Sequence, residues 1–193
     1  GKESSGILIL LEKCNSQGVI DLGCLSEANG KRDFLQKAEE GTLKAIYLVG
    51  RNPLASSSTQ RSRALEKLRL LIVQDIFMTG TAKMANVVLP ACSFVEKGGT
   101  FTNLERRIQK LNPLRPPLGQ SKSDLEIFLH LLTLLESPVS GDTPEAVFQE
   151  ICNHIPLYKD IREGEQWPKG SPYLYSEGFP MGKAKLIRVE GIR

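Results

Sequence analysis

Three short apolar runs near the middle of the chain constrain its fold more than any other feature. They are Ala45–Val49, Leu70–Val73 and Val87–Leu89. A strand that is apolar at every position fits a parallel sheet covered on both faces, whereas a half-exposed strand alternates apolar and polar residues. Helical patterns separate the runs, and strands that alternate with helices form βαβ units. The sequence therefore predicts an α/β fold with a doubly wound, mostly parallel sheet flanked by helices.

Short helices are predicted before and between these runs. Asp33–Glu40 can form a helix that Asp33 caps and Gly41 ends. A serine-rich cap region at Ser56–Thr59 leads into a second helix that ends near Lys67. Both helices precede an apolar run, as the βαβ pattern requires.

Two stronger helix patterns lie downstream. Ser123 opens the first, with Glu126 three residues later at the spacing of a capping box. Thr143 caps the second, which has Pro144 at its first position and runs to about His154. The apolar face of the first helix is so wide that we expect it to be mostly buried. The residues of that face are Leu125, Ile127, Phe128, Leu129, Leu131, Leu132, Leu134 and Leu135.

The remaining segments are predicted to be strands, loops or extended chain. Gly6–Leu11 reads as a short buried strand, and Asn15–Gly23 reads as a glycine-punctuated loop. Gly98–Asn103 reads as a turn and edge segment, and the chain from Trp167 onward is rich in Pro, Gly and Tyr and is predicted to be extended.

Composition excludes several classes of protein. The chain has 193 residues, 40% of them hydrophobic and 24% charged, so it can bury a core without disulfides or metal. A net charge of +3 is too balanced to indicate nucleic-acid binding. We expect no signal peptide, because the start lacks a basic segment followed by a long apolar block, and each apolar run is far shorter than a membrane span. We therefore expect a cytoplasmic protein without direct membrane insertion.

The four cysteines do not form a metal site. No two of the cysteines form a C-x-x-C pair, and neither histidine lies close to a pair of cysteines in the sequence. The cysteines are Cys14, Cys24, Cys92 and Cys152. Zinc and iron–sulfur sites need ligands clustered at short spacings. We therefore expect reduced, partly buried thiols and no metal ligands in this chain.

Polar or turn-forming residues stand at the end of each apolar run, where open α/β sheets bind ligands. Gly50 allows close approach of the backbone to a ligand, and Asp75 can accept hydrogen bonds from a ribose or a guanine edge. Thr79 and Thr81 can donate to phosphate. Each residue alone could simply start a loop, but three strand ends in register predict a ligand-binding edge.

Common catalytic and nucleotide motifs are missing. No G-x-G-x-x-G or G-x-x-x-x-G-K-[ST] follows any predicted strand, so a Rossmann NAD site or a P-loop is not supported. No G-x-S-x-G motif or Cys/His pair indicates hydrolysis.

Longer blocks around the strand ends resemble the molybdopterin oxidoreductase family. The resemblance spans nearly the whole chain and is most specific over residues 70–107. Within the family, formate dehydrogenase alpha subunits and the G subunit of NADH-quinone oxidoreductase are the most similar. The matching blocks are residues 44–53, 73–82, 85–90 and 96–107, with further matches at 15–18, 21–23, 166–168 and 182–184.

The resemblance implies a molybdopterin guanine dinucleotide, with Mo or W, lying across the domains of a longer parent. It makes residues 1–160 a dinucleotide-binding domain and residues 161–193 an extended linker toward a C-terminal barrel. The implied contacts are Gln17 near the pterin, Gly50, Asn52 and Pro53 near the phosphate or ribose, and Asp75 and Thr79 near the guanosine. The residues that would shape the adjacent loop, or only build the domain edge, are Glu96, Gly99, Thr100, Asn103 and Arg107.

The sequence departs from the family's pattern at two positions. Asn86 stands where Asp is usual, and Arg51 stands where Glu is usual. These changes fit either an altered nucleotide contact or a relative that no longer binds the cofactor. The connection from Gly23 to Lys44 is also short, which favours the G-subunit branch. The family's iron–sulfur cysteines, metal-ligating Cys or selenocysteine and final barrel have no counterpart in this sequence.

Two functions therefore stay open for the parent. In the first, the parent is a G subunit that takes part in electron transfer, with iron–sulfur clusters only in the upstream part and this domain retained as scaffold. In the second, the parent is a formate dehydrogenase alpha subunit that binds bis-molybdopterin guanine dinucleotide and oxidises formate. In both, the expected partners are the remaining domains of the parent and other subunits of a redox complex, which could hold it at a membrane, and not nucleic acid. The isolated segment is expected to be catalytically silent. A stand-alone nucleotide-binding module is disfavoured by the missing phosphate motif.

Overall fold

The computed structural model describes residues 13–24, 34–55, 59–104, 107–137, 139, 141–159 and 161. These residues form two compact units. The first contains the described parts of residues 1–28, 98–111 and 143–193, and the second those of residues 29–97 and 112–142. The predicted strand Gly6–Leu11, the caps at Asp33 and Ser56–Ser58 and the extended tail from Trp167 lie outside the described residues.

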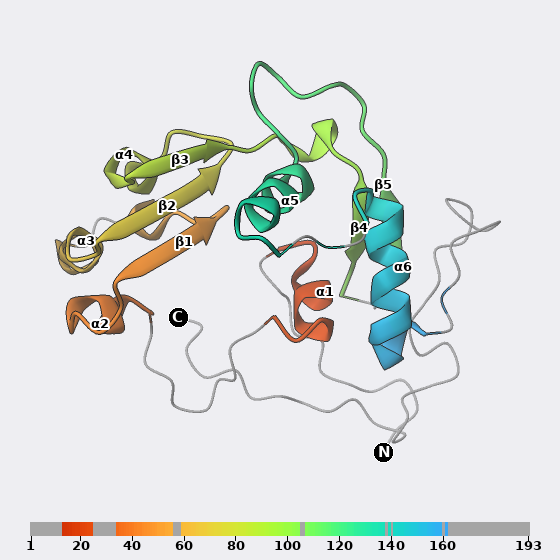
Figure 1. Ribbon diagram of the computed structural model, residues 1–193, viewed down its shortest axis with the longest axis horizontal. Helices are drawn as coiled ribbons and strands as arrows, with labels where there is room; N and C mark the ends of the chain where they lie inside the picture. Colours follow the sequence, from red (N-terminus) through yellow and green to blue (C-terminus); the bar gives the residue numbers. More distant parts are fainter. Residues whose placement is uncertain are drawn as a thin grey trace. The chain divides into compact units, whose positions relative to one another are not determined.

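The second unit contains a parallel sheet with strands in the order β1-β2-β3 (Figure 1). The strands are β1 (Ala45–Val49), β2 (Leu70–Asp75) and β3 (Val87–Pro90). All three apolar runs are thus confirmed as strands, and the predicted α/β fold with a parallel sheet flanked by helices is confirmed. β2 runs on through Gln74 and Asp75, where the sequence had indicated its end.

Short helices cover one face of this sheet and form the core of the unit. They are α2 (Phe34–Glu39), α3 (Thr59–Glu66) and α4 (Gly80–Met84), with the 3-10 turn η1 (Pro53–Ala55) between β1 and α3. The predicted end of the first helix at Gly41 is confirmed, because this glycine has φ +71° after α2. The buried residues that pack together on this face are Leu48, Leu65, Leu71, Val73 and Ala82.

Helix α5 (Asp124–Leu134) lies against the opposite face. Tyr47 alternates along β1 with the core residue Leu48, so its side chain points to the other side of the sheet. There its ring meets Phe128 of α5 edge-on, with ring centroids 6.1 Å apart. The capping box predicted at Ser123 and Glu126 is present. The sheet is therefore flanked by helices on both faces.

The prediction that this helix is mostly buried is wrong. Ile127 is buried, but Phe128 is 39%, Leu134 79% and Leu135 73% exposed. The apolar pattern shows that the helix has an apolar face, but not that anything covers the whole of it. Among the described residues, α5 contacts the sheet through Phe128, and the apolar residues at its carboxyl end extend beyond this contact.

The first unit is built on an antiparallel hairpin of β4 (Gly99–Thr102) and β5 (Ile108–Leu111). Helices α1 (Ser16–Asp21) and α6 (Pro144–His154) and the 3-10 turn η3 (Pro156–Tyr158) accompany it. The start of α6 at Thr143-Pro144 and its end at His154 are confirmed. The buried core of the unit is Ile108, Phe148, Cys152 and Tyr158.

One sequence prediction for this unit needs correction, because the predicted loop 15–23 contains helix α1. The predicted turn and edge segment at 98–103 contains β4, an edge strand of the hairpin. Gly18 is buried inside α1, next to Asn15, whose side-chain oxygen accepts a hydrogen bond from the Thr102 amide at 2.9 Å. Contact with the hairpin therefore stabilises a helix that the local sequence does not favour.

The boundary between residues 1–160 and 161–193 remains a prediction, because Ile161 is the one described residue of the second range. No helix in the described ranges is long and apolar enough to cross a membrane.

Thr102→Val is expected to lower the free energy of unfolding by about 1–2 kcal/mol. Thr102 Oγ1 and the Tyr158 hydroxyl lie 2.8 Å apart, and both residues are buried. Valine keeps the shape of threonine but removes this hydrogen bond from the first unit. Urea denaturation followed by circular dichroism measures the effect, with Thr100→Val on the same strand as control. Equal losses in the two variants would contradict the assignment.

Candidate functional site

The carboxyl ends of the three parallel strands lie at one edge of the sheet, which we call the carboxyl edge (Figure 1). Ligands of open α/β sheets bind at such an edge, because loop amides and side chains converge there. The structure brings six of the predicted residues to the loops and strand ends of this edge: Gly50, Asn52, Pro53, Asp75, Thr79 and Glu96.

Gly50 leaves the backbone open at the end of β1. It has φ +59°, and no atom lies within 4 Å of the position that a Cβ would take. Its amide donates to the Gln74 carbonyl at 2.9 Å, which fixes the start of the loop against β2. The exposed glycine backbone therefore fits the close approach of a ligand, as the sequence predicted.

The side chains of Asn52 and Thr81 are hydrogen-bonded to each other, so they do not both face a ligand. Thr81 is fully buried, and its hydroxyl donates to Asn52 Oδ1 at 2.7 Å. The Leu54 amide donates to Thr81 Oγ1 at 3.3 Å, which joins η1 to α4. The prediction that Thr81 donates to phosphate is therefore wrong, because its hydroxyl is enclosed. The amide nitrogen of Asn52 is the group that it can still offer to a ligand.

Asp75 and Thr79 each use one polar function to shape the loop after β2. Asp75 Oδ1 accepts from the Phe77 amide at 3.2 Å, and Thr79 Oγ1 accepts from the Ala82 amide at 3.2 Å as the N-cap of α4. The second carboxylate oxygen of Asp75 and the hydroxyl proton of Thr79 can still reach a ligand. Both side chains are half-buried, which fits a hydrogen-bonding role toward a nucleotide.

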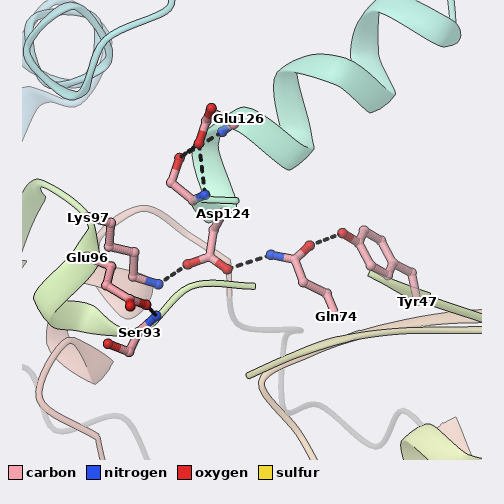
Figure 2. Close-up of polar contacts among 8 residues, drawn as sticks. Tyr47, Gln74, Ser93, Glu96, Lys97, Asp124 and Glu126 are labelled. Atoms are coloured by element: carbon pink, nitrogen blue, oxygen red, sulfur yellow. Dashed lines mark hydrogen bonds and ion pairs between the residues drawn. The ribbon is translucent and has the colours of Figure 1, made fainter. Parts of the chain in front are cut away.

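A row of polar contacts crosses the carboxyl edge on the α5 face (Figure 2). The Tyr47 hydroxyl donates to Gln74 Oε1, and Gln74 Nε2 donates to Asp124 Oδ1. Asp124 Oδ2 pairs with the ammonium group of Lys97. Gln74 has no exposed surface, so its amide orientation is fixed by a carboxylate on one side and a tyrosine on the other. We call Tyr47, Gln74, Asp124 and Lys97 the edge network.

The edge network perturbs the titration of two neighbouring groups. Burial raises the pKa of Tyr47 above its ordinary value, and the negative charge of Asp124 adds to this shift. Burial also raises the pKa of the Cys92 thiol; Lys97 opposes the shift, while the Asp124 and Glu96 carboxylates add to it. Cys92 is therefore held as a neutral, buried thiol and not as a nucleophile.

The raised pKa of Tyr47 predicts a loss of stability in alkali. In the unfolded chain the hydroxyl titrates near its ordinary pKa of about 10, whereas the folded protein keeps the proton to higher pH. This contribution is complete below about pH 10 and decreases as the pH rises through the folded pKa. Urea midpoints at about pH 8 and about pH 10.5 should fall less for Tyr47→Phe than for the unmodified chain. An equal fall in both would show that Tyr47 does not contribute.

Glu96 builds the segment after β3. Its Oε2 accepts from the Ser93 amide at 2.9 Å, in a capping box of the 3-10 turn η2 (Phe94–Glu96). Its Oε1 lies 3.4 Å from Arg115 Nε. Both carboxylate oxygens thus have partners within the protein, which supports the alternative that Glu96 builds the domain edge.

The other five predicted residues belong to the first unit. Gln17 on α1 donates to Asp21 Oδ1 at 2.8 Å, and Asn103 Oδ1 accepts from the Arg107 amide at 2.9 Å, closing the turn of the hairpin. Gly99 and Thr100 lie on β4. These contacts are internal to the unit, so a ligand contact for any of the five stays a prediction.

Asn86 lies away from the carboxyl edge. Its Oδ1 accepts from the Leu71 amide at 2.7 Å, and its own amide donates to the Leu71 carbonyl at 2.9 Å. This places Asn86 at the amino ends of the strands, where an aspartate could accept the same hydrogen bond. Its departure from the family pattern therefore does not indicate a lost cofactor contact. Arg51, in contrast, is exposed at the end of β1.

Comparison with known proteins identifies the family. A family model described as molybdopterin oxidoreductase matches residues 2–133. The chain belongs to the molybdopterin oxidoreductase family. The predicted resemblance is thereby confirmed.

Relatives from both expected branches of the family are similar to the chain. Probable oxidoreductase YjgC of Bacillus subtilis is 38% identical over 82% of this chain. The F420-dependent formate dehydrogenase 1 subunit alpha of Methanococcus maripaludis is 35% identical over 92% of it, and an NADH-quinone oxidoreductase G subunit of Rhizobium meliloti is 41% identical over 66%. The chain spans 18%, 32% and 15% of these relatives, so it corresponds to only part of each.

A solved structure supports the fold. Acetylene hydratase from Pelobacter acetylenicus superposes with a TM-score of 0.54 at 21% identity, covering 73% of this chain and 20% of the hydratase. The described residues contain no group of three or more His, Cys, Asp or Glu side chains that could hold a metal.

Proposed function

We propose that the chain is the cofactor-cradling segment of an oxidoreductase large subunit and holds the nucleotide part of a molybdopterin guanine dinucleotide. The observation that carries this proposal is the bare backbone at Gly50, whose amide binds the carbonyl of Gln74 just before Asp75, at the same strand ends as Thr79. Gly50 admits the phosphate or ribose, Asp75 accepts from the sugar or base, and Thr79 donates a hydroxyl proton. The cofactor, when bound, supplies two-electron redox chemistry at Mo or W.

Two candidates remain for the parent protein. The first is a G subunit of an NADH-quinone oxidoreductase, in which this domain takes part in electron transfer as a scaffold beside other subunits. The second is a formate dehydrogenase alpha subunit that binds the bis form of the cofactor. Identities to the two kinds of relative are similar, but the M. maripaludis formate dehydrogenase matches 92% of the chain against 66% for the R. meliloti protein. This wider match supports the second candidate.

In either candidate, the partners are the remaining domains of the parent and other subunits of a redox complex. The reaction itself needs metal ligands of the parent, and the described residues of this segment contain no cluster that could supply them. We therefore expect the isolated segment to turn over neither formate nor NADH.

Gly50→Val in the full-length parent is expected to lower the pterin content per protein several-fold. The new side chain would fill the space over the backbone at the carboxyl edge. Gly41→Val is the matched control, because Gly41 has φ +71° and is equally open but precedes β1, at the other end of that strand. Both variants pay a similar cost of about 1–2 kcal/mol for a side chain in left-handed backbone. Pterin fluorescence after acid extraction measures the content, and an equal loss in both variants would contradict the proposed site.

A further inference from the structure

We propose that Lys97 binds the negatively charged diphosphate group of a ligand at the carboxyl edge, and that Asp124 and Gln74 are positioning residues for it. This inference rests on the proposed function, because it adds a named contact to the same site.

Lys97 has the location and the exposure that an anion-binding residue needs. It follows η2, in the segment that leaves the carboxyl end of β3. Its side chain is 24% exposed, so its ammonium group is neither enclosed nor free in solvent. An ammonium has three N–H donors, and within the described residues Asp124 is the hydrogen-bond partner recorded for it. Donors therefore remain that can reach a phosphate oxygen.

The carboxylate that holds Lys97 is itself fixed. Asp124 is the first residue of α5, and its other oxygen accepts from the fully buried Gln74 (Figure 2). The backbone before α5 is joined to the end of β3, because the Cys92 amide donates to the Lys122 carbonyl at 2.8 Å and the Lys122 amide donates to the Pro90 carbonyl at 3.1 Å. Both partners of the ion pair are therefore anchored to the same strand end, and little side-chain freedom is lost when an anion binds.

Charged groups of both signs lie at this edge, because the carboxylates of Asp75 and Asp124 accompany the cationic residues. Lys97 and Arg51 bring positive charge to the ends of β3 and β1. The nearby Glu96 carboxylate is bound by Ser93 and Arg115, which reduces its repulsion of an incoming phosphate. An exposed ion pair alone contributes little to stability, whereas this pair is backed by the buried Gln74 and the half-buried Tyr47.

Titration of the chain with inorganic pyrophosphate tests this inference. Backbone amide shifts in NMR spectra should report saturable binding centred on residues 93–97. Lys97→Gln should weaken binding about tenfold or more, since a charge-assisted hydrogen bond is lost, and Lys97→Arg should keep most of it. Lys122→Gln is the matched control, because Lys122 is a neighbouring exposed lysine whose ammonium lies 3.9 Å from Glu126. It should change the affinity less than about twofold.

The positioning role has its own readout. Asp124→Asn should weaken pyrophosphate binding several-fold, and Asp124→Glu should restore part of the affinity. A merely structural Asp124 would instead lower the urea midpoint without changing the affinity. The inference is overturned if the unmodified chain does not bind pyrophosphate saturably, or if Lys97→Gln binds as well as the unmodified chain. It is also overturned if inorganic phosphate binds as tightly as pyrophosphate, because a single phosphate would then be the ligand.

These outcomes can be separated from failure of the proposed function. That function is judged on the cofactor content of the full-length parent. If the parent carries cofactor but Lys97→Gln does not change pyrophosphate binding, only the proposed Lys97 contact is refuted. If the parent carries no cofactor but the chain binds pyrophosphate through Lys97, the cofactor proposal is refuted and the anion site stands.

Discussion

Gln74→Ala is expected to lower the free energy of unfolding by about 3 kcal/mol. Gln74 is fully buried in β2 and joins Tyr47 of β1 to Asp124 of α5. Alanine would leave a cavity and would remove the partner of the Tyr47 hydroxyl and of one Asp124 oxygen. The half-buried polar groups on both sides would then lose hydrogen bonds at once, which is why the expected loss exceeds that of a single bond.

Urea denaturation followed by circular dichroism measures this loss. Gln109→Ala is the matched control, because Gln109 is an exposed strand glutamine in β5 and should change the free energy of unfolding by less than about 0.5 kcal/mol. Gln74→Met keeps the volume and isolates the polar part, for which we expect about 1–2 kcal/mol. Equal stability of Gln74→Ala and Gln109→Ala would refute the edge network as a link between the sheet and α5.

Ile108→Ala is the second large effect, at about 3 kcal/mol, and it acts in the first unit. Ile108 has no exposed surface and packs with Phe148, Cys152 and Tyr158. Truncation removes apolar contacts and leaves a cavity that the hairpin and α6 cannot close fully.

The same urea experiment measures the effect of Ile108→Ala. Leu114→Ala serves as control, because Leu114 is 82% exposed and loses little burial when truncated. Its expected change is less than about 0.5 kcal/mol. A small effect of Ile108→Ala, comparable to this control, would show that the four buried residues do not form the core of the unit.

The strands and the strong helix caps could be predicted because their signals are local. An apolar run of strand length, such as Leu70–Val73, indicates a buried strand without knowledge of its neighbours. The cap residues Ser123 and Thr143 accept hydrogen bonds from amides three residues later in the chain. The carboxyl edge followed from the strands by topology, since parallel strands end at the same edge.

The features that were missed depend on tertiary contacts. Helix α1 is tied to the hairpin by the bond from Thr102 to Asn15, which are 87 residues apart in sequence. The exposed end of α5 depends on what covers the helix, which its amphipathic pattern does not specify. The edge network joins Gln74 to Asp124 across 50 residues, and the one local sign of it is a polar residue at the end of an apolar strand.

The most direct test of the cofactor-cradling role is the Mo and W content of the purified full-length parent, together with its pterin fluorescence. If the segment cradles the cofactor, the parent should contain metal and pterin near stoichiometry with the protein, and acid should release guanine nucleotide in proportion. Absence of metal, pterin and nucleotide from an intact, folded parent would contradict it and leave this segment as a scaffold domain.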